Sequence, residues 1–385
     1  MKQTAQAPGW DGALLTSAMV LTGIGVVMNY STTAALDLDV ALPRLAQRHV
    51  AGVVAAGLVA VIAARLPLDF WRRHATHFWL LCAGLLAITP WFGIEAGGAR
   101  RWLAVPGLPI SIQPSEPARL AVMIAVAALL AKATPRSLAS PSRLAHICAL
   151  VAVPVGFLLL QPDLSSSLML CASAGLVLFA AGLPMRLLAL PAALATLCTA
   201  LFIAVNAYAR ARVRGFLDPW QRADSDGFQT IQSFVAFGRG GTFGVGLGDG
   251  RQKLFYLPEA HTDFILAVVA EEAGLVGVLA VIGAFAALCF AGLRVARCAR
   301  DSFAVLLAVG CTALIAVPAL CNAAVVMGLL PTTGLALPFL SHGSNSLVCT
   351  AAAVGILLRV ARENGQAAQP ARREAKTRKS RRVRA

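Results

Sequence analysis

The chain has 385 residues, of which 58% are hydrophobic and 13% are charged, and its formal net charge is +15. Soluble proteins average about 45–50% apolar and about 25% charged residues, so this composition excludes an ordinary soluble enzyme. The nine cysteines form no CxxC pair and lie mostly in or beside apolar runs, so we expect neither a disulfide framework nor a zinc site. The basic excess comes without a nucleic-acid-reading motif, so we expect no nucleic-acid partner.

Apolar runs of about 20 residues, the length that a bilayer core of about 30 Å requires, recur along the sequence. They predict an all-α polytopic membrane protein with about ten transmembrane helices. The expected spans are 13–29, 49–64, 76–92, 115–132, 144–160, 165–183, 187–205, 263–293, 303–328 and 340–361. No small-residue cleavage site follows the first run, so we expect residues 1–12 and that span to be retained.

Loop charges predict the orientation, because cytoplasmic loops carry an excess of Lys and Arg. The loops 65–75, 132–143, 184–186 and 294–301 are basic, whereas the alternate short loops hold only Arg44, Arg48, Arg100 and Arg101. Both termini are therefore expected in the cytoplasm. The basic tail 363–385 is expected to be disordered, with contact to anionic lipid headgroups as the alternative.

The first polar cluster precedes and opens the fourth span. Glu116 and Arg119 are three residues apart, so they can meet on one helical face. The alternative is a plain helix start, capped by Ser115 and with its acid at the positive end of the helix dipole. Trp102, by itself, is typical of a residue at the membrane interface. The next cluster, "QPDLSSS", holds Gln161 and Asp163 in a tight turn, where Asp163 could simply cap the following helix.

One long connection, 206–262, is expected on the outer side, and long connections are uncommon unless they are functional. Arg212, Arg214 and Lys253 in it could hold a phosphate or pyrophosphate, although a solvated charged loop has the same composition. Its glycines match neither a Walker loop nor a dinucleotide fingerprint. They are better explained by close backbone approach and unusual backbone angles.

The stretch "LPEAHTDFILAVVAEEAGL" places Glu259, His261 and Asp263 at the mouth of the eighth span. Glu271 and Glu272 follow about 12–14 Å further along the same helix. Ionisable groups at that depth usually face the bundle interior and find partners there. We therefore assign both glutamates a structural or cavity role, without a partner being identifiable from the sequence.

A last segment, "GLLPTTGLALPFLSHGSNSL", carries Ser341 and enters the final span with a backbone broken by Pro and Gly. Irregular backbone at membrane depth is tolerated only where protein or a water-filled cavity covers it.

Together these motifs resemble a known family. "GARRW…QPSE", "QPD", "DPWQ", "GVGLGDGRQKLFYLPEAHTDF", "AEEAGLVG" and "MGLLPTTGLALPF" are similar to the SEDS proteins, FtsW and RodA, and the wording is closer to the FtsW (division) branch. The resemblance covers the chain from Leu14 to Arg362. It implies one ten-span membrane domain over 13–362, with a large outer loop at 206–262.

The resemblance also implies an activity. Such proteins polymerise lipid II into glycan strands at the outer face of the bacterial cytoplasmic membrane, during cell division in the FtsW branch, with release of undecaprenyl pyrophosphate. They act with a class B penicillin-binding protein and other division proteins. The family's proposed catalytic aspartate corresponds to Asp263, its outer-loop Trp to Trp102, and its Glu and basic residue to Glu116 and Arg119.

The chain departs from the family pattern at three places. Arg119 stands where the family has Lys, the turn after Asp163 lacks the usual glycine, and the family's "SYGGSS" is Ser341-His342-Gly343-Ser344-Asn345-Ser346 here. A role in division and the role of a diverged paralogue therefore both stay open.

Chemically, a sugar hydroxyl needs a general base, and a leaving pyrophosphate needs cations. Asp263 is the expected base, with Glu259 and His261 positioning it. A divalent cation such as Mg or Mn could assist the leaving group, but no ligand cluster specifies one. Two other classes of function also fit the sequence: a lipid II flippase, built from broken spans and intramembrane carboxylates, and a non-catalytic division scaffold.

Overall fold

The computed structural model describes residues 11–34, 43–96, 98–107, 110–133 and 140–383, with only the backbone beyond Gln366. Each of the ten predicted spans coincides with a helix. These helices are α1 (Gly12–Ala34), α2 (Arg44–Arg65), α3 (Leu68–Phe92), α4 (Ser115–Leu130), α6 (Pro141–Leu160), α7 (Leu164–Ala180), α8 (Met185–Val205), α11 (Ile265–Cys298), α12 (Ser302–Val326) and α13 (Ser344–Val383).

Eight of the helices in the described part of the chain are long and apolar enough to cross a membrane. The other two at predicted spans are α4, with 16 residues, and α7, with 17. At 1.5 Å per residue these reach about 24–26 Å, which is less than a bilayer core of about 30 Å. The predicted class, an all-helical polytopic membrane protein, is confirmed, while the number of crossings stays a prediction.

The helix ends follow local chemistry. Asp163 accepts a hydrogen bond from the Ser166 amide and caps α7, and Asp301 caps α12 in the same way through the Ala304 amide. Pro141 occupies the first turn of α6, where its missing N–H costs nothing. Asp163 therefore caps α7, as its alternative interpretation predicted.

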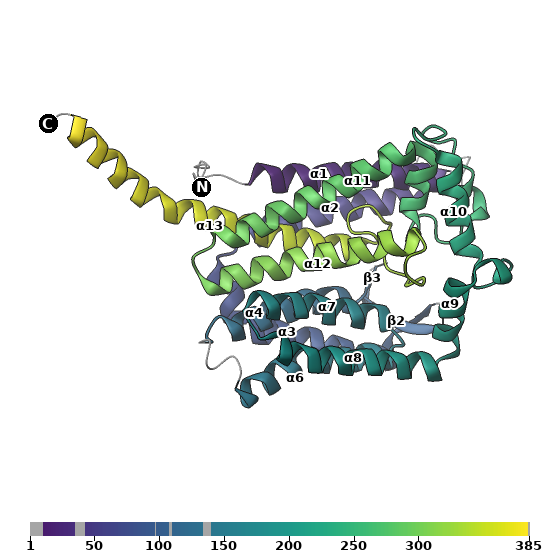
Figure 1. The fold of residues 1–385 in the computed structure, drawn as a ribbon, viewed down its shortest axis with the longest axis horizontal. Coiled ribbons are helices and arrows are strands. Elements are labelled where there is room, and N and C mark those ends of the chain that lie inside the picture. Colours follow the sequence, from purple (N-terminus) through teal and green to yellow (C-terminus); the bar gives the residue numbers. More distant parts are fainter. Residues whose placement is uncertain (1–10, 35–42, 97, 108–109, 134–139, 384–385) are drawn as a thin grey trace.

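The long helices run side by side (Figure 1). α11 packs against α12 and α1, and α13 packs along α2. α4 is buried along most of its length between α3, α12 and α7. α8 has no buried residue and lies at the margin of the bundle, against α7 and α9 (Ala207–Leu217). α4 and α12 therefore form the buried centre of the bundle.

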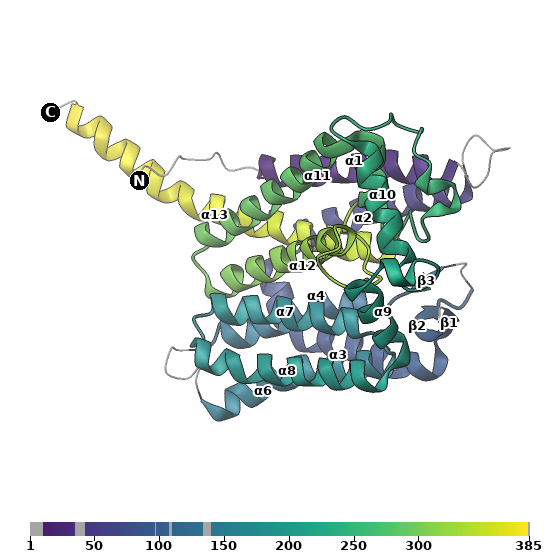
Figure 2. The ribbon, with the colours of Figure 1, turned by 45° about the vertical axis from the view of Figure 1, so that its right-hand side comes forward.

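One end of the bundle carries the irregular elements (Figure 2). A small antiparallel sheet, order β1-β2-β3, is made by β1 (Ile94–Ala96), β2 (Ala99–Ala104) and β3 (Ser111–Ile112). The connection after α8 contains α9, a 3-10 turn η1 (Trp220–Arg222), α10 (Phe228–Gly240) and a π-helical turn η2 (Gln252–Tyr256). Neither the sheet nor these helices were predicted from the sequence.

α1 begins and α13 ends at the opposite end of the bundle (Figure 1). Of the predicted N-terminal segment 1–12, all but Asp11 and Gly12 lies outside the described residues. Residues 363–383, which we expected to be disordered, continue α13 as a helix. Ala, Arg, Glu and Lys are frequent in this stretch and are good helix formers.

Candidate active site

Asp263 lies half-buried in the turn 257–264 that leads into α11. Opposite it stands Gly334, whose backbone adopts a φ of +72°. A Cβ built on Gly334 would lie 3.4 Å from Asp263 Oδ2 and 3.6 Å from each terminal nitrogen of Arg212. A carboxylate and a guanidinium from distant parts of the sequence therefore face one glycine, and its missing side chain keeps the space beside both of them clear.

Arg212 reaches this place from α9. Its Nη1 donates to the Thr332 carbonyl at 3.1 Å, its Nη2 donates to the Tyr208 hydroxyl, and its guanidinium carbon lies 4.5 Å from the centroid of the Tyr208 ring. Arg214 is exposed two residues further along α9, and residues two apart do not share a helix face. Arg212 is therefore the predicted cation that the structure brings to Asp263.

Burial raises the pKa of Asp263 from 3.8 to about 6, with a further increase from the Glu259 carboxylate and an opposing effect of Arg212. Glu259 adopts a φ of +57°, which is uncommon outside glycine. Its Oε2 accepts from the Thr262 hydroxyl at 2.7 Å. The predicted pairing of Glu259 with Asp263 is thus electrostatic, and it makes Asp263 a stronger base.

The other predicted neighbours act on the turn through its backbone. Ser341 Oγ donates to the Thr262 carbonyl at 2.5 Å and accepts from the Leu337 amide at 2.7 Å. The His342 amide donates to the His261 carbonyl at 2.8 Å, and the two imidazole centroids are 5.9 Å apart. Burial, together with His261 and Arg48, lowers the pKa of His342. Ser341 and His261 therefore tie the Asp263 turn to the segment before α13.

That segment, 331–343, is held from several helices. Ser165 of α7 donates to the Thr333 carbonyl at 2.6 Å. Phe339 adopts a φ of +64°, which is rare for a bulky residue, and its carbonyl packs so closely on α1 that a Cβ at Gly25 would overlap it. The irregular backbone predicted for this segment is present, and it is mostly buried between Leu335 and Ser341, whereas Gly334 is exposed.

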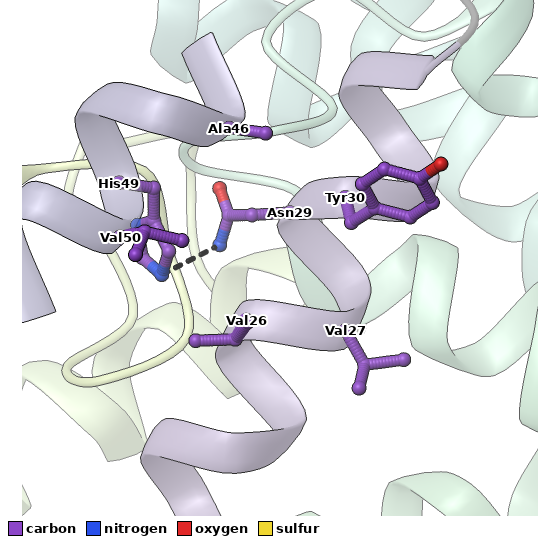
Figure 3. A pocket seen from close by; sticks show the side chains of 7 residues that line it. All are labelled: Val26, Val27, Asn29, Tyr30, Ala46, His49 and Val50. Atoms are coloured by element: carbon purple, nitrogen blue, oxygen red, sulfur yellow. Dashed lines mark hydrogen bonds between the residues drawn. The ribbon is translucent and has the colours of Figure 1, made fainter. Parts of the chain in front are cut away.

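A groove lies behind the segment, between α1 and α2 (Figure 3). It has a volume of about 270 Å³, valine side chains form much of its wall, and Asn29 and His49 lie in its floor. Asn29 Nδ2 donates to the Leu340 carbonyl at 2.5 Å and lies 3.4 Å from His49 Nε2. The His49 and His342 ring centroids are 5.9 Å apart, so a row of imidazoles leads from the groove towards His261.

Asn322 of α12 is a neighbour of Asp263 for which no role was predicted. Its Nδ2 donates to the Asp263 carbonyl at 2.7 Å and to the Leu335 carbonyl at 2.8 Å. A polar side chain inside an apolar span is a signal in itself, since such residues are rare and usually functional.

Glu116 and Arg119 form the predicted ion pair on one face of α4, and both side chains are nearly buried. They line a cavity of about 10 Å³, room for about one water molecule, together with Pro338 and Cys349. Arg119 Nε and Nη1 have no partner among the described residues. Arg119 is a buried cation with spare donors beside segment 331–343.

Trp102, Gln161 and Asp163 have structural contacts. Trp102 lies in β2 and pairs with Ile94 of β1. Gln161 Nε2 donates to the Leu86 carbonyl at 2.9 Å, and Arg101 donates to the carbonyls of the same turn. Their predicted role in substrate binding stays a prediction.

The two deeper glutamates are fully buried and have the partners that the sequence could not identify. Glu271 accepts from the Arg251 and Gln252 amides at 3.0 and 2.9 Å, and Arg239 Nε lies 3.5 Å from its Oε1. Glu272 Oε1 lies 2.6 Å from Lys253 Nζ.

Lys253, a predicted substrate-binding or supporting cation, has all its contacts inside the protein. Its ammonium is buried and donates to Glu272, to the Ser31 hydroxyl at 2.8 Å and to the Gly248 carbonyl at 2.6 Å. Since an ammonium has three donors, none is left for a phosphate. Lys253 is a structural residue that joins α1, the glycine-rich loop and α11.

The glycine-rich loop 241–250 forms hydrogen bonds with the backbone of α11 where that helix is interrupted. Gly274 adopts a φ of +66° inside the helix. The Val245 and Gly246 amides donate to the Glu271 and Glu272 carbonyls at 3.0 and 3.1 Å. In return, the amides of the residues after Gly274 donate to loop carbonyls. A Cβ on Gly244 would overlap the Glu272 carbonyl of α11, and a Cβ on Gly274 would overlap the Gly244 amide, which confirms the predicted close approach.

A divalent cation at Asp263 would have to use the two carboxylates of Glu259 and Asp263. Within the described ranges, no group of three or more His, Cys, Asp or Glu residues is placed to hold a metal. The possible Mg or Mn stays a prediction, and the chemistry below does not depend on it.

Comparisons with known proteins agree with this architecture. Residues 12–366 match the FTSW_RODA_SPOVE family, described as cell cycle protein. A relative from Geobacter metallireducens, named probable peptidoglycan glycosyltransferase FtsW, is 41% identical over 91% of this chain and 94% of its own length. A protein of the same name from Halomonas elongata is 40% identical over 93% of this chain and 91% of its own length.

Solved structures show the same fold. One chain in a study of how a peptidoglycan synthase complex coordinates polymerization and crosslinking superposes with a TM-score of 0.76 and 28% identity, over 92% of this chain and 98% of that one. The Thermus thermophilus rod shape determining protein RodA superposes with a TM-score of 0.69 and 27% identity, over 92% and 97%. The chain therefore belongs to the FtsW/RodA/SpoVE family.

Proposed function

We propose that this chain is a peptidoglycan glycosyltransferase that polymerises lipid II, with Asp263 as its general base. The single observation that carries the assignment is the pair of groups across Gly334. Asp263 is a half-buried carboxylate whose pKa is raised to about 6, and Arg212 is a fixed cation beside it. A general base works best when its pKa lies near the working pH.

In the proposed reaction, the C4 hydroxyl oxygen of one lipid II bonds to the anomeric carbon of another. The bond from that carbon to the pyrophosphate oxygen breaks, and undecaprenyl pyrophosphate leaves with the electron pair. The hydroxyl proton passes to Asp263, which typically contributes about 10²–10⁴-fold. Arg212 stabilises the negative charge that develops on the leaving group. One carboxylate is enough, because a single displacement inverts the anomeric carbon.

The relatives and the helical bundle also support a proposal for the cellular process, the partners and the location of this protein. The FtsW names support a role in cell division, and the neighbour from a peptidoglycan synthase complex supports a class B penicillin-binding protein as partner. We propose the bacterial inner membrane as the location, at the septum, with other division proteins as further partners. Both termini would be cytoplasmic, so that the Asp263 end of the bundle faces outwards.

The test is polymerisation of lipid II by the purified full chain in detergent, with and without the cognate class B synthase. Wild type should form glycan strands, and Asp263→Asn should lose at least about 100-fold of the rate. Asp224→Asn, an exposed carboxylate of the same outer connection, is the matched control and should keep the wild-type rate.

Other outcomes would separate the alternatives. A folded Asp263→Asn protein with wild-type activity would show that Asp263 is not the base. Transport of lipid II in sealed vesicles without polymerisation in detergent would indicate a flippase. Complementation of cell division by Asp263→Ala would indicate a scaffold.

A further inference from the structure

Asn322 is buried in α12, a helix that is otherwise almost wholly apolar. Its side-chain amide has two N–H donors, and both are used: one for the carbonyl of Asp263 and one for that of Leu335, at 2.7 and 2.8 Å. These two carbonyls belong to segments that are irregular rather than helical. Asn322 therefore joins α12 to the turn before α11 and to segment 331–343.

The bond to Asp263 completes a clamp on that residue's backbone. Ser341 Oγ holds the carbonyl of Thr262, on the N-terminal side of Asp263, and Asn322 holds the carbonyl of Asp263 itself. Two consecutive peptide groups are thus fixed by side chains from outside the turn. The Asp263 carboxylate is only two carbon–carbon bonds from this backbone, so its position follows that of the clamped peptides.

The second bond of Asn322 fixes the other wall of the site. Leu335 directly follows Gly334, the glycine that faces both the Asp263 carboxylate and the Arg212 guanidinium. One amide therefore sets the base and the glycine beside it relative to each other.

We propose that Asn322 is a positioning residue, which acts through the backbone of Asp263 to hold its carboxylate in register with Gly334 and Arg212. This inference rests on the proposed function, in which Asp263 is the base. A displacement of a reacting group by about 1 Å can cost about 100-fold in rate. Loss of Asn322 should therefore reduce turnover rather than substrate binding.

The test uses the purified full chain with lipid II in detergent. Asn322→Leu keeps the branched shape and the number of non-hydrogen atoms and suits an apolar helix, but it removes both donors. We expect kcat to fall about 10- to 100-fold, with KM within about twofold, and the acid limb of the pH profile to move, because Asp263 shifts relative to Glu259 and Arg212. Ser233→Ala is the matched control: its buried hydroxyl donates to the Val326 carbonyl of α12 at 2.7 Å, away from Asp263. It should keep the wild-type kcat and pH midpoint.

Two measurements keep the test decisive. Asn322→Gln retains both donors on a side chain one methylene longer, and it should keep more activity than Asn322→Leu at equal thermal stability. In a double-mutant cycle with Asp263→Glu, the two losses should not multiply, because both act on the same carboxylate.

Several results would overturn the inference. A folded Asn322→Leu protein with wild-type kcat and pH midpoint would do so, as would multiplicative losses in the cycle. If Asn322→Leu does not fold, the smaller variant Asn322→Ala, which also removes both donors, decides: a wild-type kcat and an unchanged pH midpoint in that folded protein contradict the positioning role. If the wild type makes no glycan, or if Asp263→Asn is fully active, the proposed function is wrong. That outcome depends on these two proteins alone, so it can be distinguished from a failure of the positioning role.

Discussion

Replacing Glu259 by Gln should shift the pH dependence of polymerisation towards lower pH. Burial makes the largest contribution to the raised pKa of Asp263, Glu259 raises it further and Arg212 lowers it, giving a value of about 6. A base must be deprotonated to act, so activity is lost as the pH falls through that value. Removing the Glu259 charge removes one cause of the increase, and burial still keeps the pKa above 3.8.

The size of the effect follows from the titration. With a pKa of about 6, Asp263 is about nine-tenths ionised at pH 7 and about one-tenth ionised at pH 5, so kcat/KM should fall about tenfold between them. A carboxylate with the ordinary pKa of 3.8 would still be about nine-tenths ionised at pH 5. Glu259→Gln should therefore retain more of its plateau rate at pH 5 than wild type does.

The assay is the initial rate of glycan formation from labelled lipid II in detergent between pH 4.5 and 8, with thermal unfolding measured at both extremes. Glu95→Gln is the control, because Glu95 is an exposed carboxylate of β1 paired with Arg100. It should leave the midpoint unchanged. A wild-type profile that is flat from pH 5 to 7, or a midpoint that rises in Glu259→Gln, would refute the assignment of the acid limb to Asp263.

Two further substitutions test the structural part of the bundle by thermal unfolding. Lys253→Met should destabilise the protein by about 3–5 kcal/mol, because it leaves the Glu272 charge buried and unpaired; adding Glu272→Gln should recover most of the loss, and no loss in the single variant would contradict the pairing. Gly240→Ala should lower stability because its Cβ would overlap the Ala270 carbonyl, whereas Gly238→Ala in the same helix meets nothing within 4 Å and should be neutral or stabilising. Equal stabilities for the two alanine variants would contradict the close packing of α10 on α11.

The helical plan could be predicted because a bilayer imposes it on composition. Each apolar run long enough to span became a helix, with ends that differ by a few residues, as for α11, which begins at Ile265 and not at Asp263. The sheet β1–β3 could not be predicted, since β1 and β3 have three residues or fewer and both depend on β2 for their hydrogen bonds. The local sequence pattern of a short strand does not show which other strand it pairs with.

The site was predictable where neighbours in sequence are neighbours in space. Glu259, His261 and Asp263 share one turn, and their motif places them together. The approach of Arg212 to Asp263 depends on how α9 docks against segment 331–343, which no local signal specifies. The same limit explains why the burial of Lys253 was not predicted, because the packing of the glycine-rich loop on α11 makes this basic residue a buried partner of Glu272.

The carboxylates of Asp263, Glu271 and Glu272 differ in their bonding partners, and this difference distinguishes the two structural glutamates from the proposed base. Glu271 accepts two backbone amides and Glu272 binds an ammonium and a hydroxyl, so both buried side chains are occupied by contacts that hold the broken helix together. Asp263 is held through its backbone instead, by Asn322 and by Ser341 on the preceding peptide. Its carboxylate lies beside a cation that directs its own hydrogen bonds to Tyr208 and Thr332. The proposed base needs a fixed position and oxygens that no hydrogen bond occupies, and among the described residues Asp263 combines the two.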